Sequence, residues 1–163
     1  MEELVINLVG GIPAQVAVFL LSMTPVIELR GALPIALIVY DLPLWQAFAL
    51  VVFGNMIPAF LIIFGWDYLV EFAQKYWPWL HRSMHKMEEK TQGKWDKKIE
   101  TYGPLALTLF VAIPFPLSGV WTGALAAWLF KLSRLRAIIS IFFGVLLAAI
   151  TMGLLTLGGL KFF

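Results

Sequence analysis

The stretch Thr24-Pro-Val-Ile-Glu-Leu-Arg-Gly-Ala-Leu-Pro34 places two charged side chains, Glu28 and Arg30, inside an otherwise apolar sequence. Its backbone contains three residues that commonly bend or end helices, namely Pro25, Gly31 and Pro34. A helix needs about 20 apolar residues to cross a bilayer, and this stretch is too short to cross after a preceding helix and a turn. We therefore predict a re-entrant hairpin over 24–40 with non-helical backbone around the charges, which a membrane tolerates only beside protein or water.

Composition identifies the medium that surrounds the chain. Of its 163 residues, 61% are hydrophobic and 13% are charged, and the mean hydropathy is +0.87. Soluble domains carry about 25% charged and 45–50% apolar residues. A water-soluble globule, a disordered chain and a nucleic-acid-binding module are thereby excluded. We expect an all-α integral membrane protein with a single transmembrane domain over 1–163.

Long stretches without charge predict the membrane segments. One lies within Leu4–Ile27, and two regular ones predict spanning helices over 42–66 and 136–160, which gives about three spanning helices. A further charge-free stretch, Thr101–Phe130, contains closely spaced prolines that remove helix hydrogen bonds. We therefore predict a second re-entrant hairpin over 103–130.

The distribution of basic residues predicts the orientation in the membrane. Residues 71–102 form an expected amphipathic to soluble helical connector with seven basic and five acidic residues, and the positive-inside rule places it in the cytoplasm. The cluster Lys131, Arg134 and Arg136 shares that side only if 103–130 is a hairpin. The N-terminus is then cytoplasmic and Asp41 external, and we expect the cytoplasmic membrane of a prokaryote.

The two halves of the chain, 1–70 and 103–163, show a weak internal repeat. Leu42–Gly54 aligns with Leu132–Gly144 at Leu, Ala, Phe and Gly. Upstream, Gly-Ala-Leu recurs at 31–33 and 123–125. Each half would be a hairpin followed by a span, with opposite orientation. Inverted repeats whose broken helices meet near the midplane are a known transporter design.

Glu28 and Arg30 are the main candidates for function, because ionisable groups within a membrane are costly and usually functional. A buried carboxyl group can carry a proton, since burial disfavours its charged form. The planar guanidinium of Arg30 suits a phosphate or carboxylate. The alternative is structural: the two charges pair with each other or with loop backbone and hold the hairpin together.

The second hairpin offers peptide groups and side chains that would complete the site with the first. The candidates there are Pro114, Pro116, Ser118, Gly119, Trp121 and Thr122. Gly119 and Gly123 also form a small-xxx-small pair that allows helices to approach closely. We expect Asn55, inside the span 42–66, to make a hydrogen bond between helices. The sequence contains no enzyme motif, and we expect no enzymatic activity, cofactor or metal.

The run Thr24–Ala36, together with Pro114-Phe-Pro-Leu-Ser-Gly-Val-Trp-Thr-Gly-Ala124, resembles the family of small multidrug export proteins. That family is similar to the DedA superfamily, which includes the lipid scramblases with VTT domains. The resemblance implies two facing re-entrant hairpins and proton-linked transport or flipping of lipids, including polyprenyl phosphates. It also implies that Glu28 and Arg30 are the essential charged pair.

We therefore predict a proton-coupled transporter or lipid flippase for an anionic substrate, either a lipid or a small molecule. One alternative is efflux of cationic compounds, and another is a non-transporting accessory or structural protein that recruits a partner through 71–102. The expected partners are the lipid bilayer, the substrate and protons, without nucleic acid. We also expect a homodimer, because small proteins with hairpins often pair to bury polar loops.

Overall fold

The computed structural model describes residues 11–76, 96–113 and 119–160. This part of the chain is helical and contains no strand, which confirms the all-α class. Its elements, in chain order, are α2 (Ala14–Met23), α3 (Glu28–Pro34), the π-helix η1 (Ile35–Val39), α4 (Leu44–Tyr76), α6 (Asp96–Ala112), α7 (Val120–Leu129) and α8 (Arg134–Leu160).

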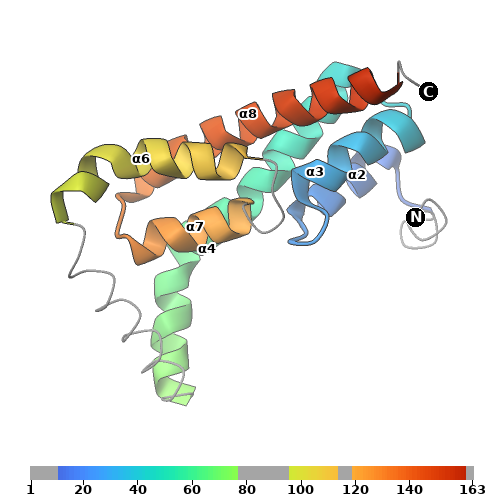
Figure 1. Ribbon diagram of the computed structural model, residues 1–163. Helices are drawn as coiled ribbons and strands as arrows, with labels where there is room; N and C mark the ends of the chain where they lie inside the picture. Colours follow the sequence, from blue (N-terminus) through green and yellow to red (C-terminus); the bar gives the residue numbers. More distant parts are fainter. Residues whose placement is uncertain (1–10, 77–95, 114–118, 161–163) are drawn as a thin grey trace.

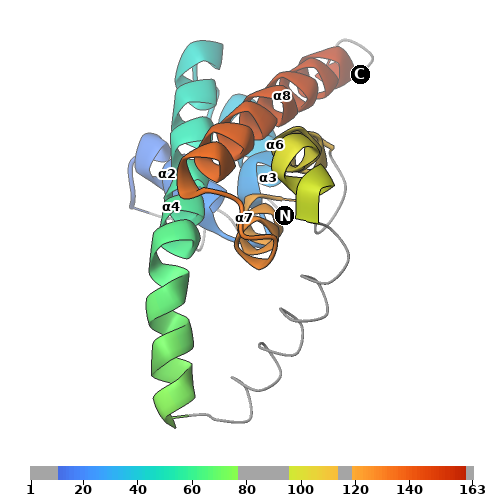
Figure 2. The same ribbon diagram turned by 90° about the vertical axis from the view of Figure 1, so that its left-hand side faces the viewer.

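The short helices form two pairs, each followed by a long helix. Helices α2 and α3 contact each other and α4, and α6 and α7 contact each other and α8. The second short helix of each pair also packs on the long helix of the other half, α3 on α8 and α7 on α4. Figure 1 shows the two pairs toward opposite ends of the described body, with the break of each pair facing the centre. Helix α8 runs along both pairs and crosses α4, and Figure 2 shows the same crossing from the side.

Two helices are long and apolar enough to cross a membrane, Leu44–Trp66 within α4 and Arg134–Gly159 within α8. These match the predicted spans over 42–66 and 136–160, although α4 continues to Tyr76. The described part of the first stretch is only the ten-residue α2. The third spanning helix stays a prediction, because residues 1–10 lie outside the described part.

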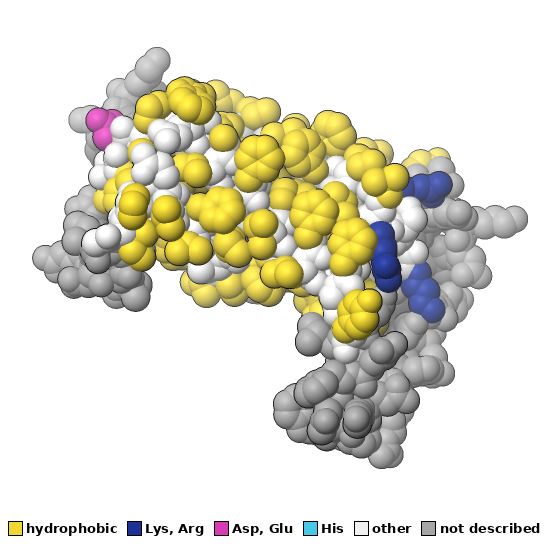
Figure 3. Space-filling model, turned by 180° about the vertical axis from the view of Figure 1, so that it is seen from behind, with side chains coloured by type: hydrophobic (Ala, Val, Ile, Leu, Met, Phe, Trp, Pro, Cys, Tyr) yellow, Lys and Arg dark blue, Asp and Glu magenta, His cyan; other side chains and the backbone are white. Residues whose placement is uncertain are grey.

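The outer surface is strongly apolar. Large hydrophobic side chains such as Phe53, Leu61 and Phe143 are more than half exposed, at 64%, 64% and 54%. Figure 3 shows hydrophobic side chains over most of one face, with Lys and Arg at one end and an acidic side chain at the other. A soluble monomer rarely exposes such a continuous apolar surface, so this surface supports a membrane protein.

The backbone around the first charged pair differs from our prediction. Residues Glu28–Pro34 form an α-helix, and helical structure continues past Pro34 as the π-helix Ile35–Val39. Proline cannot donate a helix hydrogen bond, but the wider π turn accommodates an extra residue, with the Tyr40 N–H donating to Ile35 O at 3.1 Å. The predicted non-helical backbone is therefore limited to the turn 24–27 and the left-handed Glu28, whereas Arg30 and Gly31 lie within a helix.

Close helix contacts at two glycines correspond between the halves. A Cβ atom on Gly54 of α4 would lie 2.8 Å from the carbonyl oxygen of Phe19 in α2. A Cβ atom on Gly144 of α8 would lie 2.8 Å from the carbonyl oxygen of Thr108 in α6. Both distances are too short for any side chain. The long helix of each half therefore packs backbone to backbone on the first short helix.

Candidate functional site

Glu28 lies at the break between α2 and α3, and its side chain reaches the other helix pair. Its exposed fraction is 8%, and its backbone is left-handed with φ 46°. The carboxylate accepts hydrogen bonds from the backbone N–H groups of Val120 and Trp121. It also lies directly against Gly119, where any Cβ would overlap the carboxylate.

These contacts make Glu28 the cap of α7. The first N–H groups of a helix have no partner within it, and the positive end of the helix dipole lies there. The residue that precedes α7, Gly119, provides no side-chain cap. The carboxylate of Glu28 supplies one from a distant part of the sequence, and the absence of a side chain at Gly119 makes room for it.

Arg30 makes the complementary contact at the end of α6. Its Nη2 donates a hydrogen bond to the carbonyl oxygen of Ile113 at 2.9 Å. Ile113 directly follows the last residue of α6. The last carbonyl groups of a helix lack partners and carry the negative end of the dipole, so a cation is favourable there. Glu28 and Arg30 thus bind the two helix ends on either side of the α6–α7 break.

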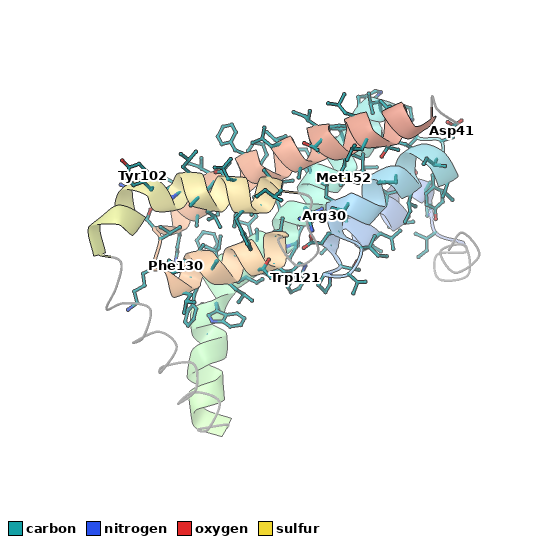
Figure 4. The ribbon with its side chains drawn as sticks, in the orientation of Figure 1. Arg30, Asp41, Tyr102, Trp121, Phe130 and Met152 are labelled. Carbon is teal, nitrogen blue, oxygen red and sulfur yellow. The ribbon has the colours of Figure 1, made fainter. Side chains whose placement is uncertain are left out.

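Trp121, in the α6–α7 pair, makes a contact with the α2–α3 pair. Its indole Nε1 donates to the carbonyl oxygen of Met23, the last residue of α2, at 3.2 Å. Figure 4 shows Trp121 and Arg30 close to the centre of the molecule, where the two breaks meet. The structure therefore brings together Glu28, Arg30, Gly119 and Trp121, four of the predicted site residues.

A small cavity lies beside the Glu28 carboxylate. Its volume is about 10 Å³, which is roughly the space of one water molecule. It is lined by Glu28, Leu29, Arg30, Asn55, Val111, Gly119, Val120, Val145 and Ala148. In this conformation the site accepts a water molecule and excludes a drug or a lipid headgroup.

Asn55 does not make the expected bond between helices. Its Nδ2 donates to Val51 O of the same helix at 3.2 Å, and its buried Oδ1 has no hydrogen-bond partner. The side chain is 1% exposed. Sequence reasoning placed Asn55 among the structural residues, whereas the structure places it on the same cavity as Glu28.

The remaining predicted site residues either make contacts within their own segment of the fold or lie outside the described part of the chain. Thr122 donates from Oγ1 to Gly119 O at 3.1 Å, within the first turn of α7. A Cβ on Gly123 would lie 2.6 Å from Val111 Cγ2, so α7 lies close to α6 at this residue. A Cβ on Gly31 would lie 2.7 Å from Ile27 Cγ2, and Pro25 is exposed in the turn. Residues Pro114, Pro116 and Ser118 lie outside the described part.

Sequence reasoning missed an apolar groove between α6 and α7, with a volume of about 320 Å³. It is lined by Gly103, Ala106, Leu107, Phe110, Ala126, Ala127, Phe130 and Leu132. The small residues on the facing surfaces of α6 and α7 leave the space open, and the side chains of Phe110 and Phe130 line its sides. The available signal was this small-residue spacing on both helices. Among the described residues no group of three or more acidic or histidine side chains would hold a metal ion.

A family described as "Putative small multi-drug export protein" matches residues 28–151, which is more than half of the chain. The chain belongs to this family. The match begins at Glu28 and includes Arg30, Asn55, Gly119 and Trp121, so the small multidrug export family covers these site residues but not Met23, which lies before the matched range. No curated protein and no solved structure matches the chain, and the relationship to the DedA superfamily stays a prediction.

Proposed function

We propose that the chain is a proton-coupled membrane exporter in which protonation of Glu28 controls the contact between the two helix pairs. The observation that carries this proposal is the buried carboxylate of Glu28, which belongs to α3 but caps α7. Hydrogen bonds to an ionised acceptor are stronger than those to a neutral one. A proton on Glu28 removes the charge that holds α7, and the two pairs can then separate.

Arg30 extends the effect of Glu28 protonation from α7 to the end of α6, on the other side of the α6–α7 break. In the described state it binds Ile113 O at the end of α6 and interacts electrostatically with Glu28. When the pairs separate, the guanidinium exchanges the peptide carbonyl for an anionic group of the substrate, for which its planar donors are suited. Substrate binding at Arg30 and proton binding at Glu28 then both change the α6–α7 break, so that each affects the other.

We further propose that each helix pair is a re-entrant hairpin and that the halves form an inverted repeat. The corresponding contacts at Gly54 and Gly144 support it. So do the left-handed residues Asp41 and Lys131, which lie three positions before α4 and α8. In Figure 3 the acidic and basic ends are opposite, which supports an external Asp41 and a cytoplasmic connector in a prokaryotic cytoplasmic membrane.

The proposed substrate is an anionic amphiphile, such as a phospholipid or a polyprenyl phosphate. The groove between α6 and α7 offers about 320 Å³ of apolar space for a hydrocarbon chain. Two of its lining residues, Phe130 and Leu132, flank Lys131, and Arg134 and Arg136 follow on α8. Arg134 lies over the ring of Phe64 on α4, which leaves Lys131, between two residues of the groove, as the basic residue nearest to it in sequence. A cation beside an apolar groove suits a negative headgroup that carries an apolar tail.

Export of cationic compounds is the second candidate, and the description of the family favours it. In that case Glu28 would bind the substrate cation in competition with protons, and Arg30 would serve only as the partner of Ile113. The two candidates differ in the charge of the substrate that moves. They also differ in whether Arg30 is needed for its binding.

Transport by the purified protein in proteoliposomes tests the proposal. A fluorescent anionic lipid and a cationic dye are each offered with and without a pH gradient. We expect gradient-dependent movement of the lipid, its loss in Glu28→Gln, and no loss in the control Asp41→Asn, since Asp41 is exposed at the far end of the molecule. Movement of the dye alone would favour the second candidate. Equal activity of Glu28→Gln and the unmodified protein would refute the coupling role, and no movement of either compound would favour the accessory protein.

A further inference from the structure

Asn55 lines the cavity beside Glu28 and carries an acceptor without a partner. Its side chain is 1% exposed, and its Oδ1 has no partner. The amide orientation is fixed by the bond from Nδ2 to Val51 O at 3.2 Å, because the reverse orientation would set two oxygens against each other. The free oxygen therefore belongs to a residue that lines the same small cavity as Glu28.

Two acceptors at one small cavity favour a donor between them. An ionised carboxylate only accepts hydrogen bonds, and so does an amide oxygen. A buried acceptor without a partner is unfavourable. A water molecule in the cavity would donate to both oxygens, and a protonated Glu28 would itself donate to Asn55 Oδ1. The volume of about 10 Å³ suits a single water molecule.

We propose that Glu28 and Asn55 form a shared proton-binding site. While Glu28 is ionised, the site holds one water molecule. When Glu28 is protonated, its O–H group donates a hydrogen bond directly to Asn55 Oδ1 and the site closes. This inference rests on the proposed function, in which Glu28 couples a proton, and it adds the second residue of that site. The proton arrives as hydronium. One O–H bond of hydronium breaks, an O–H bond to a Glu28 oxygen forms, and a neutral water remains.

The surroundings favour a proton over a metal cation. Arg30 is the charged side chain beside Glu28 and lines the same cavity, so it repels a cation. Among the described residues, no other titratable side chain lines the cavity, since its remaining lining is Leu29, Asn55, Val111, Gly119, Val120, Val145 and Ala148. Apart from the oxygens of Glu28 and Asn55, the lining side chains are a guanidinium and hydrocarbon groups, which do not bind sodium, and an ion with an incomplete set of ligands is costly to bury.

Substitutions of Asn55 should move proton binding in opposite directions. Asn55→Ala removes the oxygen that accepts a hydrogen bond from protonated Glu28, and it gives water more room beside ionised Glu28. The proton affinity of Glu28 should therefore fall by about tenfold. Asn55→Asp places a second carboxyl group at the cavity, and two like charges disfavour joint ionisation, so proton affinity should rise by about tenfold or more. A residue that only packs the helices would not produce opposite shifts.

The measurement is an infrared titration of the protonated carboxyl band in the full-length protein in liposomes, with Glu28→Gln used to assign the band. The pH midpoint should be lower in Asn55→Ala and higher in Asn55→Asp, and unchanged by replacing potassium with sodium. Equal midpoints in the unmodified protein and Asn55→Asp would overturn the inference even if Asn55→Ala failed to fold. A midpoint that sodium lowers would also overturn it, in favour of a cation site.

Transport measured on the same variants separates this inference from the proposed function. Opposite shifts of the midpoint without any transport would leave the shared site in place and refute the exporter. Transport that depends on Glu28, with midpoints that Asn55 does not change, would support the exporter and refute the shared site.

Discussion

Trp121 donates its indole N–H to the carbonyl oxygen of Met23 at 3.2 Å, although 98 positions separate the two residues. A side chain at the start of α7 thereby satisfies a carbonyl at the end of α2. Glu28 crosses the same interface in the other direction to reach Val120 and Trp121. The two helix breaks therefore stabilise each other through backbone groups, and neither pair is complete alone.

Trp121→Phe should destabilise this interface. Phe keeps the aromatic bulk but lacks the N–H group, so Met23 O loses its donor. We expect a loss of about 0.5–1.5 kcal/mol in the free energy of unfolding, measured by denaturation in detergent. Trp45→Phe is the matched control, because Trp45 is 75% exposed, and equal losses in the two variants would contradict the prediction.

Gly119→Ala should be among the most damaging single substitutions. The added methyl group would overlap the Glu28 carboxylate, which must then leave the N–H groups of α7. We expect a loss of at least about 2 kcal/mol in unfolding free energy, and loss of gradient-dependent transport. Gly158→Ala is the control, since nothing lies within 4 Å of a Cβ there.

A double substitution tests the cause of that damage. If the clash with Glu28 is responsible, Gly119→Ala combined with Glu28→Ala should cost less than the sum of the single substitutions. Additive costs would show that Gly119 matters for another reason.

Gly54→Ala and Gly144→Ala should have similar effects on stability. Each added methyl group meets a backbone oxygen of the neighbouring helix, Phe19 O or Thr108 O. We expect each to lower the thermal midpoint, whereas Gly65→Ala, in open space on α4, should raise it slightly because alanine favours helix. A tolerated substitution at only one of the two glycines would show that the contacts are not equivalent.

Labelling of single cysteines should reveal the orientation in the membrane, and the chain has no native cysteine to interfere. With an impermeant thiol reagent, Lys86→Cys and Ser133→Cys should react from the cytoplasmic side, and Asp41→Cys from the outside. Reaction of Lys86→Cys and Ser133→Cys from opposite sides would show that 101–130 crosses the membrane. The re-entrant hairpin and the inverted repeat would then both be wrong.

Features that depend on local sequence were predictable. The two long helices follow from stretches without charge, and the break between α6 and α7 follows from closely spaced prolines, because both signals act within a few residues. Pro34 misled the prediction, because helical structure continues past it as the π-helix Ile35–Val39.

The partners of the site residues were not predictable in the same way. Arg30 binds the carbonyl of Ile113 and Glu28 binds the N–H groups of Val120 and Trp121. These are backbone groups, which every residue except proline offers alike, so the sequence marks no particular partner. The position of Asn55 beside Glu28 likewise depends on how α4 rotates against α3, which periodicity alone does not determine.

The left-handed backbone of Glu28, with φ 46°, has a consequence for the energy of the resting state. A residue with a side chain in this conformation costs about 1–2 kcal/mol, and hydrogen bonds to a charged acceptor offset that cost at about 1.5–3 kcal/mol each. After protonation the bonds fall to about 0.5–1.5 kcal/mol each, which is comparable with the cost. Protonation of Glu28, as proposed above for transport, would therefore remove most of the margin by which these hydrogen bonds exceed the conformational cost of the turn.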